Sequence, residues 1–348
     1  MVTGSAPTQP EPPQLQDAGL LLDLVEQLGR APRHALVKVA LRSGDAESQA
    51  RTIESWCARS GNEMVTLEPG VATIRRGPRL DPFADLDPSQ LPGTRLWMYT
   101  NFDCNLACDY CCVRSSPRTP RAALGADRVR QLAQEAAAAG VSELILTGGE
   151  PFLLPDVDDL VAACTTELPT TLLTNAMLFH GRRLEALRRM DRERLTLQIS
   201  LDSPSPEIHD THRGSGSWDR AVAGIRTARQ EGFQVKVAAT LPYEQTHHVE
   251  PFHTFLDTLD IPRSHRVIRA LARRGVADHG LELTVETLIP EVTVTATGVY
   301  WHPVAAEHND QLVTRDIFPL ADAITLVRDR FSAYRSDAVA AAQWFPCA

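Results

Sequence analysis

Apolar and polar positions follow two different patterns on either side of residue 95. Before it, short apolar runs alternate with helical spacing, and Pro69-Gly70 marks a turn. The predicted elements are a helix, a strand, a helix and two strands, over residues 20–28, 34–41, 45–59, 63–67 and 71–75. This order predicts a small α/β sandwich domain over residues 19–77.

After residue 95, six apolar runs of strand length alternate with helical segments. The predicted strands cover residues 96–100, 143–147, 170–174, 195–201, 234–240 and 265–270. Predicted helices lie between them, for example over 127–139, 156–164, 182–190 and 218–231. Repeated βα units with apolar strands favour a parallel sheet covered by helices. In barrels of such units the active site forms at the carboxyl ends of the strands.

The remaining segments have other patterns. Residues 1–18 are rich in Pro and polar residues, which predicts a disordered tail, and the prolines of 78–94 predict a linker. In the last segment, 278–348, apolar positions at 292, 294 and 296 alternate before Thr297-Gly298, and an apolar run returns over 299–301. We expect a hairpin there, then a helix over 319–331, which together make a short α+β extension.

Composition excludes several functional classes. The chain has 348 residues, 43% of them hydrophobic, and a formal net charge of -9. The acidic balance disfavours nucleic-acid binding, and no apolar run reaches the length of a membrane span. No signal sequence opens the chain, so we expect a cytoplasmic protein. Residues 263–274 are locally rich in Arg, and we interpret them as a strand and loop with solvated side chains.

Three cysteines carry the most specific chemistry. Cys104, Cys108 and Cys111 have C-x3-C-x2-C spacing, with Tyr110 before the third. Electron-transfer clusters commonly use four Cys, so three close thiolates indicate a four-iron cluster with one iron open to a small molecule. The alternative is zinc, but structural zinc sites have four ligands and no second Cys pair is present. With only seven cysteines in the chain, a disulfide scaffold is not expected.

The run from Asn101 to Val113 resembles the cluster loop of radical S-adenosylmethionine (radical SAM) enzymes. The resemblance extends from about residue 96 to 277 through further motifs at the ends of apolar runs, which are Gly148-Gly-Glu-Pro151, Thr174-Asn175, Ser200-Leu-Asp202 and His209 to Gly214. Cys112 does not fit the spacing of the family, so we assign it to packing. The resemblance implies a partial (β/α)6 TIM-like barrel over residues 95–277.

The same resemblance implies the cofactors and their ligands. Cys104, Cys108 and Cys111 would hold one [4Fe-4S] cluster, and S-adenosylmethionine would bind its open iron. Its reductive cleavage would give a 5′-deoxyadenosyl radical, with an electron from a reductant such as flavodoxin or ferredoxin. The glycines would let the backbone approach the methionine part. The residues expected to contact the cofactor are Tyr110, Gly148, Gly149, Glu150, Asn175, Ser200 and Arg213.

The flanking domains bear on the substrate. The C-terminal extension resembles the SPASM or twitch extensions of peptide-modifying radical SAM enzymes, but has His302 where a cluster Cys is usual and too few cysteines for a second cluster. The N-terminal module resembles sulfur carriers of the TusA type, without their Cys-Pro pair. It is either a partner-binding domain or a structural cap. We therefore expect a peptide or protein substrate. The alternatives are a small metabolite, or a non-catalytic metal-binding scaffold.

Overall fold

The computed structural model describes residues 24–344, except 25–26, 29–30, 33, 42–45, 78–85, 243–244, 246–248 and 286. The predicted disordered tail and Cys347 lie outside the described residues. Two compact units are present. One contains the residues up to Leu86 together with the end of the last helix from Ser332, and the other is Asp87–Phe331.

The first unit is a three-stranded antiparallel sheet with helical cover. Its elements are β1 (Leu36–Ala40), α2 (Ala46–Ser60), β2 (Glu63–Glu68) and β3 (Val71–Arg75), and the strand order is β1-β3-β2. Ile53, Trp56 and Cys57 of the helix pack on Val39 and Ile74 of the sheet. Burial and the nearby Glu54 raise the pKa of Cys57 to about 12, so this thiol stays neutral and is a poor nucleophile.

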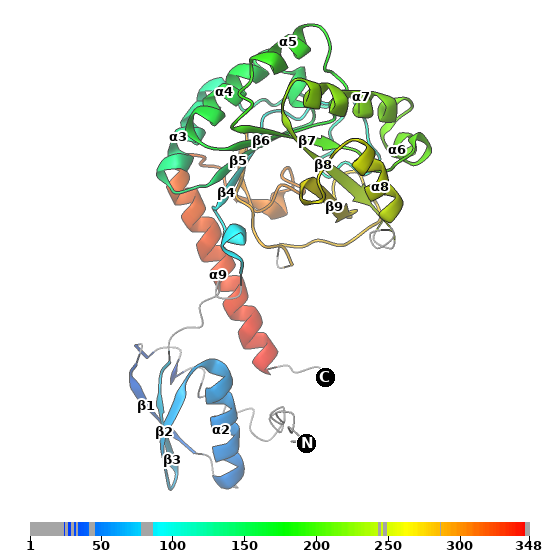
Figure 1. Ribbon diagram of the computed structural model, residues 1–348. Coiled ribbons are helices and arrows are strands. Elements are labelled where there is room, and N and C mark those ends of the chain that lie inside the picture. The colour runs from blue at the N-terminus through cyan, green and yellow to red at the C-terminus, as the bar shows by residue number, and fades with distance from the viewer. Residues whose placement is uncertain are drawn as a thin grey trace. The chain divides into compact units, whose positions relative to one another are not determined.

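The second unit is built on a nine-stranded sheet in the order β12-β11-β10-β4-β5-β6-β7-β8-β9, with helices on its outer face (Figure 1). The six parallel strands are β4 (Arg95–Tyr99), β5 (Glu143–Thr147), β6 (Thr170–Thr174), β7 (Leu195–Ser200), β8 (Gln234–Leu241) and β9 (Arg266–Ala270). The helices are α3 (Ala126–Ala138), α4 (Val157–Glu167), α5 (Arg182–Arg189), α6 (Pro206–Arg213), α7 (Ser217–Gln230) and α8 (Glu250–Thr258). These βα units form the predicted partial TIM-like barrel, and each strand begins and ends within one residue of its predicted bounds.

The C-terminal hairpin differs from its prediction. Its strands are β10 (Thr293–Thr295) and β11 (Gly298–Tyr300), so the turn is Ala296-Thr297, one residue earlier than expected. The expected alternation is wrong, because all of β10 is buried. The physical reason is that β10 pairs in parallel with β4 and antiparallel with β11, inside the nine-stranded sheet. The chain then adds β12 (Leu312–Thr314) and α9 (Leu320–Trp344).

Two hydrogen bonds between residues far apart in sequence hold α9 against the rest of this unit. The backbone N–H of Leu320 donates to a carboxylate oxygen of Glu135 at 2.6 Å, and Arg328 donates to the carbonyl of Pro92 at 2.8 Å. Within the described residues, no helix is long and apolar enough to cross a membrane.

Candidate active site

A cavity of about 460 Å³ opens at the carboxyl ends of the six parallel strands. Its lining includes the strand-end residues Tyr99, Thr147, Thr174, Ser200 and Ala270. Of the ten site residues predicted from the sequence, nine line this cavity: Cys104, Cys108, Cys111, Tyr110, Gly148, Gly149, Asn175, Ser200 and Arg213. The tenth, Glu150, does not line it. The motifs therefore converge in space although they span more than a hundred residues of sequence.

Asn101 anchors the cysteine loop to the barrel. This fully buried amide follows β4 and donates to the carbonyl of Asp103 at 2.9 Å and to the carbonyl of Glu150 at 3.1 Å. Its own carbonyl accepts from the backbone N–H of Gly149 at 3.0 Å. The amide thus ties the segment that carries Cys104 to the end of β5. Sequence reasoning missed this residue, whose only signal is a polar side chain directly after a buried strand.

The two glycines after β5 pack closely against residues 101–103, at the start of the cysteine loop. A Cβ on Gly149 would lie 2.2 Å from the carbonyl oxygen of Asp103, and one on Gly148 would lie 2.4 Å from the side-chain oxygen of Asn101. Both distances are too short for any real side chain. A side chain at Gly149 would therefore meet the cysteine loop, which already fills that direction.

The carboxylate of Glu150, a residue expected to contact the cofactor, is hydrogen-bonded within the protein. The side chain is fully buried and turned toward β6. One carboxylate oxygen accepts from the N–H of Phe152 at 3.0 Å and the hydroxyl of Thr174 at 2.7 Å, and the other accepts from the N–H of Asn175 at 2.8 Å. Burial raises the pKa of Glu150, and these hydrogen bonds oppose that shift. The carboxylate joins β5 to β6.

The three motif thiols face the same cavity in a shielded environment. Burial raises the pKa of Cys104 to about 12 and that of Cys108 to about 11. Backbone N–H groups point at two of the sulfurs: Leu106 donates to Cys104 at 3.4 Å and Ser115 donates to Cys111 at 3.3 Å. Cys104 and Cys108 therefore stay neutral until a cation stabilises their thiolates, and N–H groups favour a charged sulfur.

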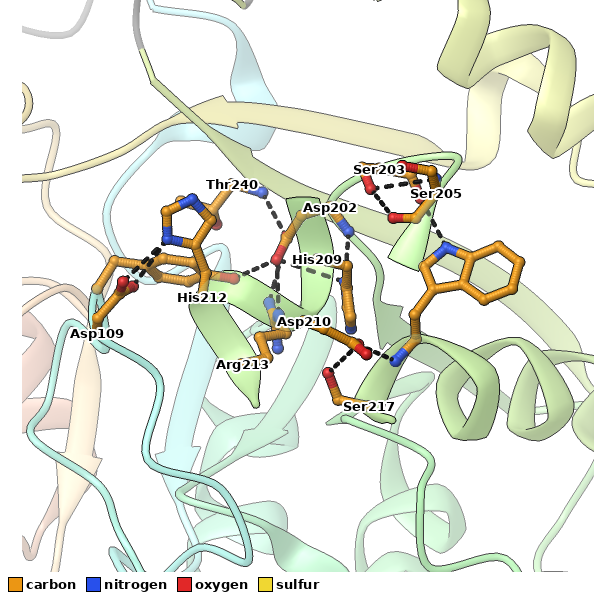
Figure 2. A network of polar contacts seen from close by, with 12 residues as sticks. Asp109, Asp202, Ser203, Ser205, His209, Asp210, His212, Arg213, Ser217 and Thr240 are labelled. Carbon is orange, nitrogen blue, oxygen red and sulfur yellow. Dashed lines mark hydrogen bonds and ion pairs between the residues drawn. The ribbon is translucent and has the colours of Figure 1, made fainter. Parts of the chain in front are cut away.

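Asp202 is the centre of a polar network that holds two residues of the cavity lining, Tyr110 and Arg213 (Figure 2). Its buried carboxylate accepts from the hydroxyl of Tyr110, from the guanidinium of Arg213 at 2.6 and 3.3 Å, and from the N–H of Thr240 at 3.0 Å. Burial alone would raise the pKa of Asp202, but the charge and hydrogen bonds of Arg213 outweigh it and lower that pKa. The Arg213 guanidinium also lies 5.4 Å from the centre of the Tyr110 ring.

This network changes how Tyr110 and Arg213 are interpreted. Both were predicted to contact the cofactor directly, and both line the cavity, but each is hydrogen-bonded to Asp202. His212, which lies on α6 beside Arg213, also contacts the cysteine loop. Its ring nitrogen lies 3.0 Å from a carboxylate oxygen of Asp109. Helix α6 therefore positions the loop, and Asp202 of the Ser200-Leu-Asp202 motif is its anchor.

Asn175 and Ser200 remain suited to a ligand. Asn175 donates to the side chain of Asn105 at 2.8 Å and accepts from the N–H of Met177 at 3.0 Å, which leaves one amide hydrogen for the cavity. The Ser200 hydroxyl lines the cavity and has no hydrogen-bond partner in the part of the chain that the structure describes.

Comparison with known proteins agrees with this geometry. Residues 98–259 match the model of the radical SAM superfamily. That stretch, a little under half of the chain, is a radical SAM domain. This domain holds the cysteine loop, the glycine run and the Asp202 network, so the family assignment and the cavity rest on the same residues.

Individual relatives cover only part of the chain. An AdoMet-dependent heme synthase of Methanosarcina barkeri is 34% identical over 140 residues, 40% of each chain. The subtilosin biosynthesis protein AlbA of Bacillus subtilis is 32% identical over 143 residues, 40% of this chain and 31% of AlbA. The chain thus spans less than half the length of these relatives. Their names indicate different substrates, so the likeness selects no substrate class.

Among solved structures, native anSMEcpe with bound AdoMet and a Cp18Cys peptide has a TM-score of 0.52 at 12% identity. The match covers 68% of this chain and 81% of anSMEcpe. At that identity the likeness concerns the fold alone, and it supports the partial TIM-like barrel.

The cavity fits a [4Fe-4S] cluster on chemical grounds. Its three thiols are ligands of the kind that iron–sulfur clusters use, and iron supplies the cation that the raised pKa of Cys104 and Cys108 calls for. Within the described residues, no three His, Cys, Asp or Glu side chains converge on a single metal ion. The thiolates of a cluster bind different irons, so they lie farther apart than the ligands of a single metal ion.

Proposed function

We propose that this chain is a radical SAM enzyme that acts on a peptide or protein. Cys104, Cys108 and Cys111 hold one [4Fe-4S] cluster, with S-adenosylmethionine in the cavity beside it. When bound, these groups supply the reductive cleavage that gives a 5′-deoxyadenosyl radical. The observation that supports this most is the convergence of three thiols and the strand-end motifs on one cavity.

The chain's own residues bind and orient in this scheme. Arg213 neutralises Asp202, so that buried carboxylate places no unpaired negative charge beside the thiolates. Asn175 and Ser200 offer an amide hydrogen and a hydroxyl to the ribose or carboxylate of the cofactor. Apolar side chains such as Val113 and Val304 line the cavity as well and limit water around a radical.

A peptide substrate is supported by two features. One relative is named for bacteriocin biosynthesis. The C-terminal hairpin also extends the barrel sheet beyond β4, where His302 and Pro303 line the cavity. A small metabolite is the second candidate, which the heme synthase relative favours. The first unit, with its inert Cys57, suits binding of a partner better than sulfur transfer.

The test is anaerobic reconstitution with iron and sulfide. We expect about four irons per chain, near-complete loss when all three cysteines become Ala, and slow formation of 5′-deoxyadenosine with a strong reductant such as dithionite. The His180→Gln variant, changed at an exposed residue, is the control. A fully loaded, reducible protein that forms no deoxyadenosine would remove the enzymatic proposal and favour the scaffold alternative.

A further inference from the structure

The Arg-rich segment 263–274 places one arginine without a paired carboxylate in the lining of the cavity. Three of its five arginines are paired with carboxylates: Arg263 with Glu250, Arg266 with Asp257, and Arg274 with Asp310. Arg269 and Arg273 have no ion pair or side-chain hydrogen bond to any described residue. Of these two, Arg269 lines the cavity and Arg273 does not. Both side chains are exposed, as expected from the sequence, and Arg269 also lines the cavity.

The charge of Arg269 is not balanced by the cavity wall. Arg269 lies on β9 opposite Thr240 of β8, which also lines the cavity. The wall's other guanidinium, Arg213, is neutralised by Asp202. The carboxylate in the cavity wall, Glu291, forms an ion pair with Arg95 and accepts from the indole N–H of Trp97 at 3.0 Å. Among described lining residues, Arg269 is therefore the cation without a counter-ion.

His302 adds a hydrogen-bond donor in the same part of the cavity. Its Nδ1 accepts from the backbone N–H of Val304 at 3.1 Å, which places the ring proton on Nε2. Burial and then the charges of Arg269 and Arg95 lower the pKa of His302 to about 4, so the ring is neutral near pH 7. No described residue accepts from Nε2. A free cation and a free N–H donor thus lie near each other.

We propose that Arg269 and His302 form a subsite for one carboxylate group of the peptide substrate, from an Asp or Glu side chain. This inference rests on the proposed function. A guanidinium binds a carboxylate through two parallel hydrogen bonds, and the imidazole N–H adds a third. The single positive charge of Arg269 balances one carboxylate. A phosphate carries nearly two negative charges, so binding it would need a further cation. The subsite shares its cavity with the cluster cysteines, so the acidic residue lies at or beside the modified position.

The test uses three pools of capped synthetic nonapeptides that differ only at the central residue. The first pool has Asp or Glu there, the second Asn or Gln, and the third phosphoserine. The reconstituted full chain is incubated with each pool and S-adenosylmethionine, and retained peptides are counted by mass spectrometry. The proteins compared are the wild type, Arg269→Gln, His302→Phe and Arg273→Gln, the last being an unpaired arginine outside the cavity.

The wild type and Arg273→Gln should retain acidic peptides about tenfold better than their amides, a preference that Arg269→Gln loses and His302→Phe reduces. Equal retention of the two pools by the wild type, a preference for phosphoserine, or an unchanged preference in Arg269→Gln would each overturn the subsite. Uncoupled deoxyadenosine formation separates the two proposals. Loss of it in Arg269→Gln with full iron, while Arg273→Gln keeps it, would assign Arg269 to the cofactor and overturn the subsite. Absence of deoxyadenosine formation from the wild type would contradict the proposed function, while peptide retention would still decide the subsite.

Discussion

Gly149 and the carbonyl of Asp103 lie so close that a Cβ on the glycine would sit 2.2 Å from that oxygen. The neighbouring N–H of Glu150 donates to the same carbonyl at 3.0 Å. The glycine run after β5 and the cysteine loop after β4 are thus held together by direct backbone contact. The position of Cys104, one residue beyond Asp103, depends on this contact.

Gly149→Ala should therefore lower iron content as well as stability. The added methyl group forces the Cys104 segment to move, at a cost of about 1–3 kcal/mol or more, typical of overpacking. We expect iron after anaerobic reconstitution to fall by more than half. Gly140→Ala is the matched control, because a Cβ there meets open space, and its positive φ of +79° adds only local strain. Full iron content in Gly149→Ala would show that the loop tolerates the shift.

Glu150→Gln should destabilise the domain although the change is nearly isosteric. The carboxylate accepts from three donors, and an amide has only one oxygen, so at least one buried donor loses its partner. That loss costs about 1–3 kcal/mol. Urea unfolding measures it, with the exposed Glu193→Gln as control. An unfolding free energy equal to that of the control would mean that Glu150 is protonated in the native protein.

The strands and the cysteine motif could be predicted from sequence because each is a local pattern. Apolar runs bounded by polar residues predict β4 to β9, and the thiol spacing together with the Gly148-Gly-Glu-Pro151 run indicates a cluster. The direction of side chains within the site could not be predicted. Glu150 belongs to a motif associated with a cofactor, yet its carboxylate turns to β6, since the N–H of Asn175 needs an acceptor there. Likewise, nothing local to residues 293–295 indicates pairing with a strand almost two hundred residues earlier.

Two buried histidines should make the stability of the iron-free protein depend on pH. Burial, as the main cause, lowers the pKa of both His209 and His302 to about 4, against about 6.5 when unfolded. The unfolded chain then binds more protons between these values. Stability is fully present above about pH 6.5 and is lost as pH falls toward 4, by about 3 kcal/mol for each histidine.

Urea unfolding at several pH values checks this. His302→Phe should show a smaller loss of stability between about pH 7 and pH 5 than the wild type, whereas the exposed His180→Gln should follow the wild type. A steeper loss in His302→Phe than in the wild type would mean that His302 is charged in the folded protein.

The choice of Cys111 over its neighbour as the third ligand is open to a direct test. Both thiols line the cavity, but Cys111 accepts from the N–H of Ser115, and burial raises the pKa of Cys112 to about 12 beside the packed ring of Tyr99. Cys112→Ala should keep about four irons per chain, losing only modest packing energy, while Cys111→Ala should lose most of its iron. The measurement is iron and sulfide per chain, with the absorbance of the reconstituted cluster. Should Cys112→Ala lose its iron and Cys111→Ala retain it, the loop presents C-x3-C-x3-C to the cluster, and the backbone N–H of Ser115 serves packing alone.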